Sequence, residues 1–446
     1  MSTFGTDFIL MFIAINSEEP GPPELVFTTL ESSEVAVTVE VPSLSYKRSL
    51  TVSMSSLGFT SLRRDVRMSG TGTSHKGVLV TASAEVSVYG INKGLYSTDG
   101  FLALPMDTLG KEYYAISYTP DGHYCELGIV ATKDDTIVHL ILPTHNNLRI
   151  MYKGNTYQQG EIIAVNLDRL ETFQLQTSSD LTGLHIVSNE IIAAYSGHTG
   201  VEDTHPGHSV VQLLPVSRWG KSFAVTSFPG RTNGDIIRLV TSADNTTLTI
   251  DGIQTVLPFK GWHHNFTLPS GSSKYFTTDK PVLAIQHGQD QSNHANGDIT
   301  TAIVPPIEQY QSEYTFVTPD ASDGNFINEA LVVVRTTDQD TVYLDSASMT
   351  SKNGDTWQPV GGSSPAMVAK RVRVTVGQNH IYMKDSTETF GIILFGYTNK
   401  ESYSFPGGMG MKIINSAVSI TIVELSDPKL RRYVLFIEVR MICLET

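Results

Sequence analysis

Two polar loops in the middle of the chain carry residue types that bind metal ions. Residues 197–209, GHTGVEDTHPGHS, and residues 286–298, QHGQDQSNHANGD, each mix histidines with acidic residues. Neutral imidazole nitrogens and carboxylate oxygens together hold zinc and other divalent cations. The one cofactor that the sequence suggests is therefore a divalent metal, with these candidate ligands: Asp203, His205, His208, His294 and Asp298.

The same two loops also suit a simpler interpretation, as solvated polar connections between strands. Their histidine spacing differs, and neither contains the HExxH helix of many zinc enzymes. The corresponding stretch nearer the start of the chain offers only Asn92 and Asp99. Because loops are also where proteins concentrate binding residues, both interpretations stay open.

The chain carries no recognisable catalytic motif. It lacks the GxSxG nucleophile motif of many hydrolases. Its glycine-rich stretches, 69–74 and 90–94, do not join a strand to a helix as a phosphate-binding loop does. We therefore expect a protein that is not an enzyme, and we attribute most of its aspartates to turns.

The elements that position the loops recur along the chain. Four short segments, GTDF, GKEY, GKSF and QSEY, end at Phe8, Tyr113, Phe223 and Tyr314, which lie 105, 110 and 91 positions apart. Spacings of about 100 residues are those of a small all-β domain. Differences among them are what loop insertions produce, so the sequence predicts tandem copies of one unit.

Within each unit, two further patterns predict β-strands. An apolar stretch, a polar turn and an alternating stretch predict one β-hairpin per unit, over residues 26–39, 129–140, 239–250 and 333–344. A later apolar stretch in each unit predicts another pair of strands, over residues 77–90, 184–197, 275–288 and 390–397. We find no amphipathic helical pattern longer than a couple of turns.

The expected fold is all-β, with four tandem modules of about 100 residues that resemble β-sandwiches. A β-propeller is the alternative, although its blades span only about 40–50 residues and each unit would have to hold two. The expected modules span residues 5–104, 105–214, 215–305 and 306–411, and residues 412–446 form an unmatched C-terminal tail.

Composition limits the partners of the chain. Its 45 acidic residues outnumber 31 basic ones and give a net charge of −14, which disfavours nucleic acids and anionic membranes. Two cysteines, Cys125 and Cys443, cannot build a disulfide framework. The apolar stretch from Phe8 to Ile15 lacks the charged start and cleavage site of a signal peptide, and YVLFIEV in the tail is too short to span a membrane.

Two asparagines lie in the Asn-x-Ser/Thr pattern that accepts glycans on secreted proteins. They are Asn245 and Asn265, and Asn245 falls in an expected hairpin turn. Aromatic side chains provide a different link to sugars, because exposed rings stack on them. The candidates for stacking are Trp219, Trp262, Trp357 and Tyr403.

Segments distributed over residues 5–411 resemble the family named after the N-terminal domain of IgGFc-binding protein. They include GTDFILMF, ESSEVAVTVEVP, LPVSRWGKSFAVTSF, DNTTLTIDG, TTDKPVLAIQHG and GYTNKESYSFPGGM. The resemblance implies a secreted, extracellular binding module that recognises a glycoprotein or another immune or mucus component. Two alternatives are a protein that binds or processes carbohydrates, and a structural mucus or matrix component that self-associates.

Overall fold

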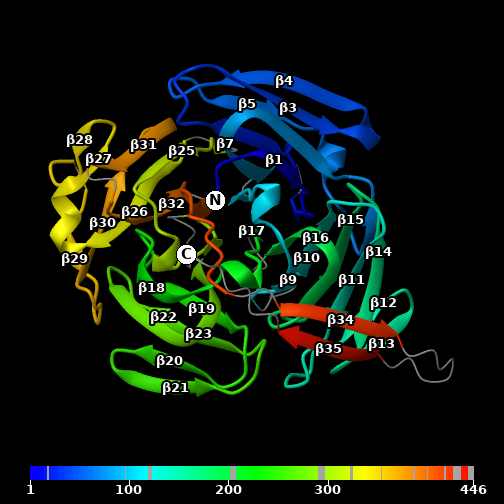
Figure 1. Ribbon diagram of the computed structural model, residues 1–446. Coiled ribbons are helices and arrows are strands. Elements are labelled where there is room, and N and C mark those ends of the chain that lie inside the picture. The colour runs from blue at the N-terminus through cyan, green and yellow to red at the C-terminus, as the bar shows by residue number, and fades with distance from the viewer. Residues whose placement is uncertain are drawn as a thin grey trace.

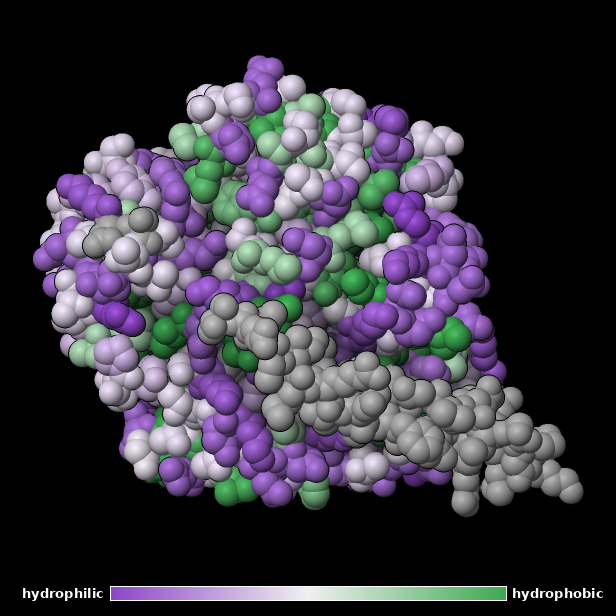
Figure 2. Space-filling model, in the orientation of Figure 1, coloured by the Kyte–Doolittle hydropathy of each residue, from purple (hydrophilic) through white to green (hydrophobic). Residues whose placement is uncertain are grey.

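The computed structural model is a ring of β-sheet units around a central axis (Figure 1). It describes residues 1–446 except 18–19, 96, 119–122, 201–206, 290–296, 322–324, 353, 385–386, 399, 416–417, 425–432 and 440–446; for residues 418–424 and 433–439 it describes the backbone only. Hydrophilic residues predominate on the face drawn in Figure 2, and hydrophobic ones form scattered patches.

The first unit has two layers that share one long strand. Its strands are β1 (Gly5–Leu10), β2 (Glu24–Thr28), β3 (Val35–Val41), β4 (Tyr46–Val52), β5 (Gly58–Ser61), β7 (Val78–Gly94) and β8 (Ser97–Leu102). The beginning of β7 pairs with β1 and β3, and its end pairs with β2 and β8. In β3, Val35, Val37, Val39 and Val41 are buried on one face, as the period of two requires.

The second and third units repeat this plan around their own long strands, β16 and β23. The second contains β9 (Gly110–Tyr114), β10 (Cys125–Ala131), β11 (Thr136–Ile141), β14 (Ile162–Leu167), β15 (Thr172–Thr177), β16 (His185–His198) and β17 (Ser209–Gln212), with β6 (Gly72–Ser74) added at its edge. The third contains β18 (Gly220–Thr226), β19 (Asp235–Thr241), β20 (Thr246–Ile250), β21 (Ile253–Leu257), β22 (His263–Leu268), β23 (Ser273–Gly288) and β24 (Thr300–Ile303).

In the fourth unit the two layers are separate sheets. One comprises β25 (Glu313–Thr318), β27 (Val342–Leu344), β28 (Ala347–Ser348) and β31 (Gly377–Met383). The other comprises β26 (Ile327–Arg335), β29 (Gln358–Pro359), β30 (Met367–Arg373), β32 (Gly391–Tyr397) and β33 (Ser402–Pro406). Here β31 and β32 stand in place of one long strand.

Short connecting elements complete the ring. A 3-10 turn precedes the first strand of each later unit: η3 (Met106–Thr108), η4 (Val216–Arg218) and η5 (Ile307–Gln309). Each follows a proline, Pro105, Pro215 or Pro306, whose fixed φ suits an extended connector. The remaining elements are η1 (Pro42–Leu44), η2 (Arg64–Val66), η6 (Thr336–Thr341) and the hairpin β12 (Ile150–Tyr152) and β13 (Asn155–Tyr157).

The all-β, sandwich-like expectation is confirmed, and the structure adds the circular arrangement of the units. The inner strands β8, β17, β24 and β33 pack against one another around the axis. Backbone hydrogen bonds join residues 1–3 to residues 409–411, with 2.9 Å from Thr3 N to Met409 O and 3.0 Å from Met411 N to Met1 O. The ring therefore closes where the repeated region begins and ends.

Two local predictions are wrong. The expected hairpins are not paired strands: β2 and β3 each pair with β7, and β10 and β11 each pair with β16. The polar turn between them carries the chain from one layer to the other. The expected strand pairs at 77–90, 184–197 and 275–288 are single long strands that serve both layers.

The tail contains two strands, β34 (Val418–Glu424) and β35 (Tyr433–Val439), which form an antiparallel pair. The segment YVLFIEV is β35. Among the described residues, no helix has the length and apolar character to cross a membrane. The module boundaries 5–104, 105–214, 215–305 and 306–411 stay a proposal.

Candidate functional site

The described ends of the loops chosen from the sequence lie at one end of the ring. Each inner strand starts where the long strand beside it ends, because the two are antiparallel. The four connections follow Gly94, His198, Gly288 and Tyr397. The described ends of these connections therefore gather around the same end of the axis. Of the candidate metal ligands, Asp203, His205 and His294 lie outside the described residues.

His208 is a buried residue that joins the second unit to the first. Its Nδ1 donates to the carbonyl oxygen of His198 at 2.7 Å, and its Nε2 accepts from Asn92 Nδ2 at 2.9 Å. Its backbone N–H donates to Ser97 Oγ at 2.9 Å. Burial lowers the pKa of His208 to about 3, so the imidazole is neutral. Since both ring nitrogens are engaged, a metal would bind only by displacing one of these partners.

Asp298 is buried where the third unit meets the fourth. Its Oδ1 accepts from Ser402 N at 2.7 Å and from Ser402 Oγ at 2.8 Å, and its Oδ2 has no hydrogen-bond partner among the described residues. Burial raises the pKa of this carboxyl well above its usual range, although Ser402 and Arg231 oppose the shift. Arg231 Nη2 donates to the Asp298 carbonyl at 2.5 Å. These contacts bind two loops together.

The structure does not bring His208 and Asp298 into a metal cluster with other described residues. Within the described part of the chain, no group of three or more His, Cys, Asp or Glu side chains is placed to hold a metal ion. With three of the five proposed ligands outside the described residues, the metal site stays a prediction.

Asp99 is the central residue that sequence reasoning missed as a site. It lies on β8, is completely buried and receives hydrogen bonds from all four units. Its Oδ1 accepts from Gly100 N at 2.8 Å and, at 3.3 Å each, from Thr300 Oγ1 and Ser404 N; its Oδ2 accepts from Val210 N at 3.2 Å. Burial raises the pKa of Asp99 well above its usual range, and these donors oppose the shift. No sequence motif marks this role, because three of the four donors come from other units.

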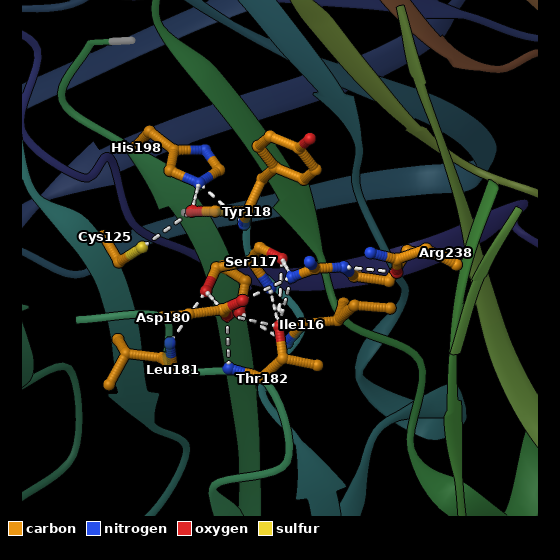
Figure 3. Close-up of polar contacts among 11 residues, drawn as sticks. Ile116, Ser117, Tyr118, Cys125, Asp180, Leu181, Thr182, His198 and Arg238 are labelled. Carbon is orange, nitrogen blue, oxygen red and sulfur yellow. Dashed lines mark hydrogen bonds and ion pairs between the residues drawn. The ribbon is translucent and has the colours of Figure 1, made fainter. Parts of the chain in front are cut away.

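A second polar network holds the second and third units together (Figure 3). Arg238 on β19 donates through Nη1 to Asp180 Oδ2 at 2.6 Å, to Thr182 Oγ1 at 3.0 Å and to the Ser117 carbonyl. Burial alone would raise the pKa of Asp180, but Arg238 and Thr182 bring it below its usual range. The network is therefore a buried ion pair with its hydrogen-bonding capacity well satisfied.

Tyr118 extends this network between the same units. Its ring stacks on His287 with centroids 4.6 Å apart, and the Arg238 guanidinium lies 5.0 Å from the ring centroid. His198 Nε2 lies 2.6 Å from the Tyr118 carbonyl oxygen, and burial lowers the pKa of His198 to about 4. Neutral His198 and His287 repeat one motif, each with Nδ1 at 2.8 Å from a hydroxyl on the next strand.

Cys125 does not make this network reactive. Its thiol donates to the Tyr118 carbonyl at 3.0 Å, and burial raises its pKa to about 12. A nucleophilic cysteine needs the thiolate, which such a pKa disfavours at neutral pH. The described polar groups at this end of the ring therefore form structural hydrogen bonds and ion pairs, which hold units and loops in place.

Comparison with known proteins shows the family of this chain. A family model described as IgGFc binding protein matches residues 99–396. The chain belongs to this family. The match begins at the central Asp99 and ends within β32, so it includes the complete second and third units.

A curated protein of the same name is also similar to this chain in sequence. Human IgGFc-binding protein is 22% identical over 401 residues, which cover 88% of this chain. The chain spans only 7% of the length of that relative.

The other residues named from the sequence fall in different settings. Trp219 and Tyr403 were expected to be exposed, which is wrong: Trp219 Nε1 donates to the Leu214 carbonyl at 2.9 Å, Tyr403 OH donates to Asn328 Oδ1 at 2.7 Å, and both rings are buried. Trp262 and Trp357 are partly exposed. Alternating positions on sheet strands place large rings in the core as readily as outside it.

Both proposed glycan acceptors are exposed. Asn245 lies in the turn before β20 with a φ of 50°. Asn265 lies on β22, where its Oδ1 accepts a hydrogen bond from Arg238 Nε at 2.9 Å. Asn245 thus offers a freer amide, and glycosylation of either residue stays a prediction.

Proposed function

We propose that this chain is a non-enzymatic extracellular module that recognises a secreted protein or glycoprotein, such as an immune or mucus component. The observation that carries the proposal is membership of the IgGFc-binding family over residues 99–396. Those residues include most of the inner and long strands that present the loops at the axial end of the ring.

In this proposal the recognition surface is formed by the axial loops, which are the four connections that follow Gly94, His198, Gly288 and Tyr397. They stand on packed inner strands, and Asn92, His208, Asp298 and Ser402 fix their ends by buried hydrogen bonds. Rigid scaffolds that hold loop ends reduce the entropy lost on binding. Differences in loop length among the units would then give each unit a distinct contact.

The Fc part of immunoglobulin G is the first partner to test, because the human relative is named for binding it. Immobilised Fc, Fab and a mucin-type glycoprotein would be exposed to the purified chain, with retention measured by surface plasmon resonance. Retention on Fc or on the glycoprotein, but not on Fab, supports the proposal. Retention on none of the three contradicts it.

A matched pair of lysine variants locates the contact. Lys400 lies in the axial loop before β33, whereas Lys153 lies in the exposed turn between β12 and β13. Lys400→Glu is expected to weaken retention and Lys153→Glu to leave it unchanged, since a charge reversal matters only at a contact. Equal losses in both variants would move the interface away from the axial loops.

Carbohydrate binding is the second candidate function. It is favoured by one observation, a cationic groove beside an exposed tyrosine between the first and second units.

A further inference from the structure

A groove of about 610 Å³ opens between the first and second units. This volume lies in the range of small-ligand sites. The residues that matter for its chemistry are Asn16, Arg64, Arg67, Lys76, Tyr124 and Gln176. Neither the family match nor the axial loops account for this groove.

The walls of the groove are held to both units. After β1, the chain runs across to the second unit, where Ala14 N donates to Gln174 Oε1 at 2.9 Å and Asn16 N donates to the Thr199 carbonyl at 2.8 Å. On the other side, β6 pairs with β15. A site between these segments is therefore preformed.

Arg67 is a buried cation whose partners among the described residues are all uncharged. Only 7% of the surface of Arg67 is exposed. Its Nη2 donates to the carbonyl oxygens of Gly21 at 2.8 Å and Lys93 at 2.9 Å, and its Nε donates to Asn92 Oδ1. In the described part of the chain, no carboxylate forms an ion pair with Arg67, and its Nη1 makes no hydrogen bond. Burial, together with nearby Arg64, lowers the pKa of Arg67 to about 10.

Other groups make the groove locally positive in a chain of net charge −14. Lys76 Nζ donates to the Arg67 carbonyl at 2.6 Å, and Arg64 lines the groove nearby. Among the described lining residues the acidic one is Asp65, which is already paired with Arg63, with Arg63 Nη2 2.7 Å from Asp65 Oδ2. A buried guanidinium with only neutral partners is stabilised by an anion, and carboxylate or sulfate oxygens match its donors.

The uncharged lining indicates what carries the anion. Tyr124 is 51% exposed and presents an aromatic face, and the amides of Asn16 and Gln176 lie in the same groove. An aromatic face with neighbouring amides suits a ring that has one apolar face and a polar edge. The limited volume suits a few such rings.

We propose that this groove binds an anionic saccharide, whose carboxylate or sulfate pairs with Arg67 while a sugar ring packs on Tyr124. The proposal rests on the second candidate function and is separate from protein recognition at the axial loops. It places the charged end of the ligand deep between the units and the neutral end at the open rim.

Calorimetric titration tests this site. The probes are the methyl glycoside of N-acetylneuraminic acid, galactose 6-sulfate and neutral galactose, each added to the whole chain. We expect at least one acidic sugar to bind about tenfold more tightly than galactose, with affinity falling as salt rises. Equal binding of acidic and neutral sugars would overturn the proposal.

Variants identify the residues involved. The double variant Arg64→Gln and Lys76→Gln is expected to lose about tenfold in affinity for the acidic sugar, and Tyr124→Ala to weaken the acidic and neutral sugars alike. Arg67→Lys keeps the charge but loses the planar fork that holds Gly21, Lys93 and Asn92, so weaker binding together with a lower melting temperature is expected, and the double variant is the cleaner test of binding. Exposed Arg48 on β4 provides the matched control, since Arg48→Gln leaves the groove intact.

Two further probes separate other ligands from a saccharide. If inorganic sulfate binds as tightly as galactose 6-sulfate, the sugar ring contributes nothing and the saccharide assignment is wrong. If an oligoglutamate peptide binds more tightly than either acidic sugar, the groove is a peptide site instead. If none of the sugars binds, this saccharide proposal fails. The Fc and glycoprotein retention assay is unaffected, because it tests a contact at Lys400 in the axial loops.

Discussion

Buried groups at the axial end of the ring carry charges or imidazoles that the sequence places in polar loops. His208 was predictable as a polar residue of interest, because it stands in a loop rich in His and Asp. Its actual partners, Asn92 and the His198 carbonyl, were not predictable, since Asn92 belongs to another unit. The same limit applies to Asp99, three of whose four donors come from positions 111 to 305 residues away along the chain.

Because His208 is buried as a neutral base, its contribution to stability depends on pH. The folded pKa of about 3 lies below the unfolded value of 6.5, so the unfolded state binds more protons on acidification. The stability contributed by neutral His208 is complete above about pH 6.5 and is lost as pH falls from there toward 3. In the variant His208→Asn, the urea midpoint should fall less steeply between pH 6.5 and pH 4.

The same variant should be less stable at neutral pH by roughly 1–3 kcal/mol, because buried hydrogen bonds are lost. Exposed His75→Asn is the matched control for a change of histidine count. A pH profile of His208→Asn parallel to that of the unmodified chain would contradict the assignment of a buried neutral imidazole at position 208.

At the scale of elements, the sequence predicts strands well but not their partners. Alternation in β3 and β11 reveals which residues face inward, because the period of two is a local property. The polar residues Asp134 and Asp135 read as a hairpin turn, yet β11 continues along β16 in the same direction as β10 and joins the other layer, which nothing local predicts. The long strand β16 carries polar Asn189 and Glu190 near its middle, which reads as a turn although pairing continues beyond them.

Contacts between elements of different units are the second feature that local pattern misses. Arg238 looks like one polar residue in the apolar strand β19, and only the folded ring shows that it reaches Asp180 of the second unit. Its side chain is 4% exposed and that of Asp180 is 21% exposed. Breaking such a pair leaves an uncompensated buried charge.

We therefore expect Arg238→Met to lower the free energy of unfolding by about 3–5 kcal/mol. The double variant with Asp180→Asn should recover part of this loss, since it removes the unpaired carboxylate. Arg335→Met, which breaks the exposed pair with Glu388, is the control and should change stability by less than about 1 kcal/mol. Urea denaturation measures the free energy of unfolding of all three variants. Equal losses in Arg238→Met and Arg335→Met would contradict a stabilising role for the buried ion pair between Arg238 and Asp180.

At the scale of the whole molecule, the ring closes through segments from the two ends of the repeated region. Thr3 is completely buried, and its Oγ1 accepts from Met409 N at 3.0 Å. The predicted tandem repeat explains why four similar units exist, but a repeat by itself fits a linear array as well as a ring. Closure depends on side chains such as Thr3, which stand outside the repeated strands.

Replacing Thr3 by Val keeps the shape of the side chain but removes the acceptor for Met409 N. The expected loss in unfolding free energy is about 1–3 kcal/mol, the usual effect of an unsatisfied buried donor. Exposed Thr6→Val in the neighbouring strand β1 is the control. Hydrogen exchange at the amides of residues 409–411 should accelerate in Thr3→Val only, and unchanged exchange there would show that this contact does not hold the ring closed.

The proposed modules are expected to differ in their independence, because their cores are connected differently. The third unit has a separate cluster of buried apolar residues between its layers, which includes Phe223, Leu239 and Phe276. The buried residues of the second unit, such as Leu127 and Ile186, belong instead to a cluster shared with the first and fourth units. A fragment can bury on its own only the apolar surface that its own residues cover.

Fragment 215–305 should therefore keep β-sheet circular dichroism and a cooperative thermal transition, whereas fragment 105–214 should not. Both fragments lose the clamp between Arg238 and Asp180, so that loss does not distinguish them. A cooperative transition in both fragments would indicate modules that fold independently and then assemble. A transition in neither would mean that the ring folds as one cooperative body, and the boundaries read from the repeat would then record the origin of the sequence rather than units of stability.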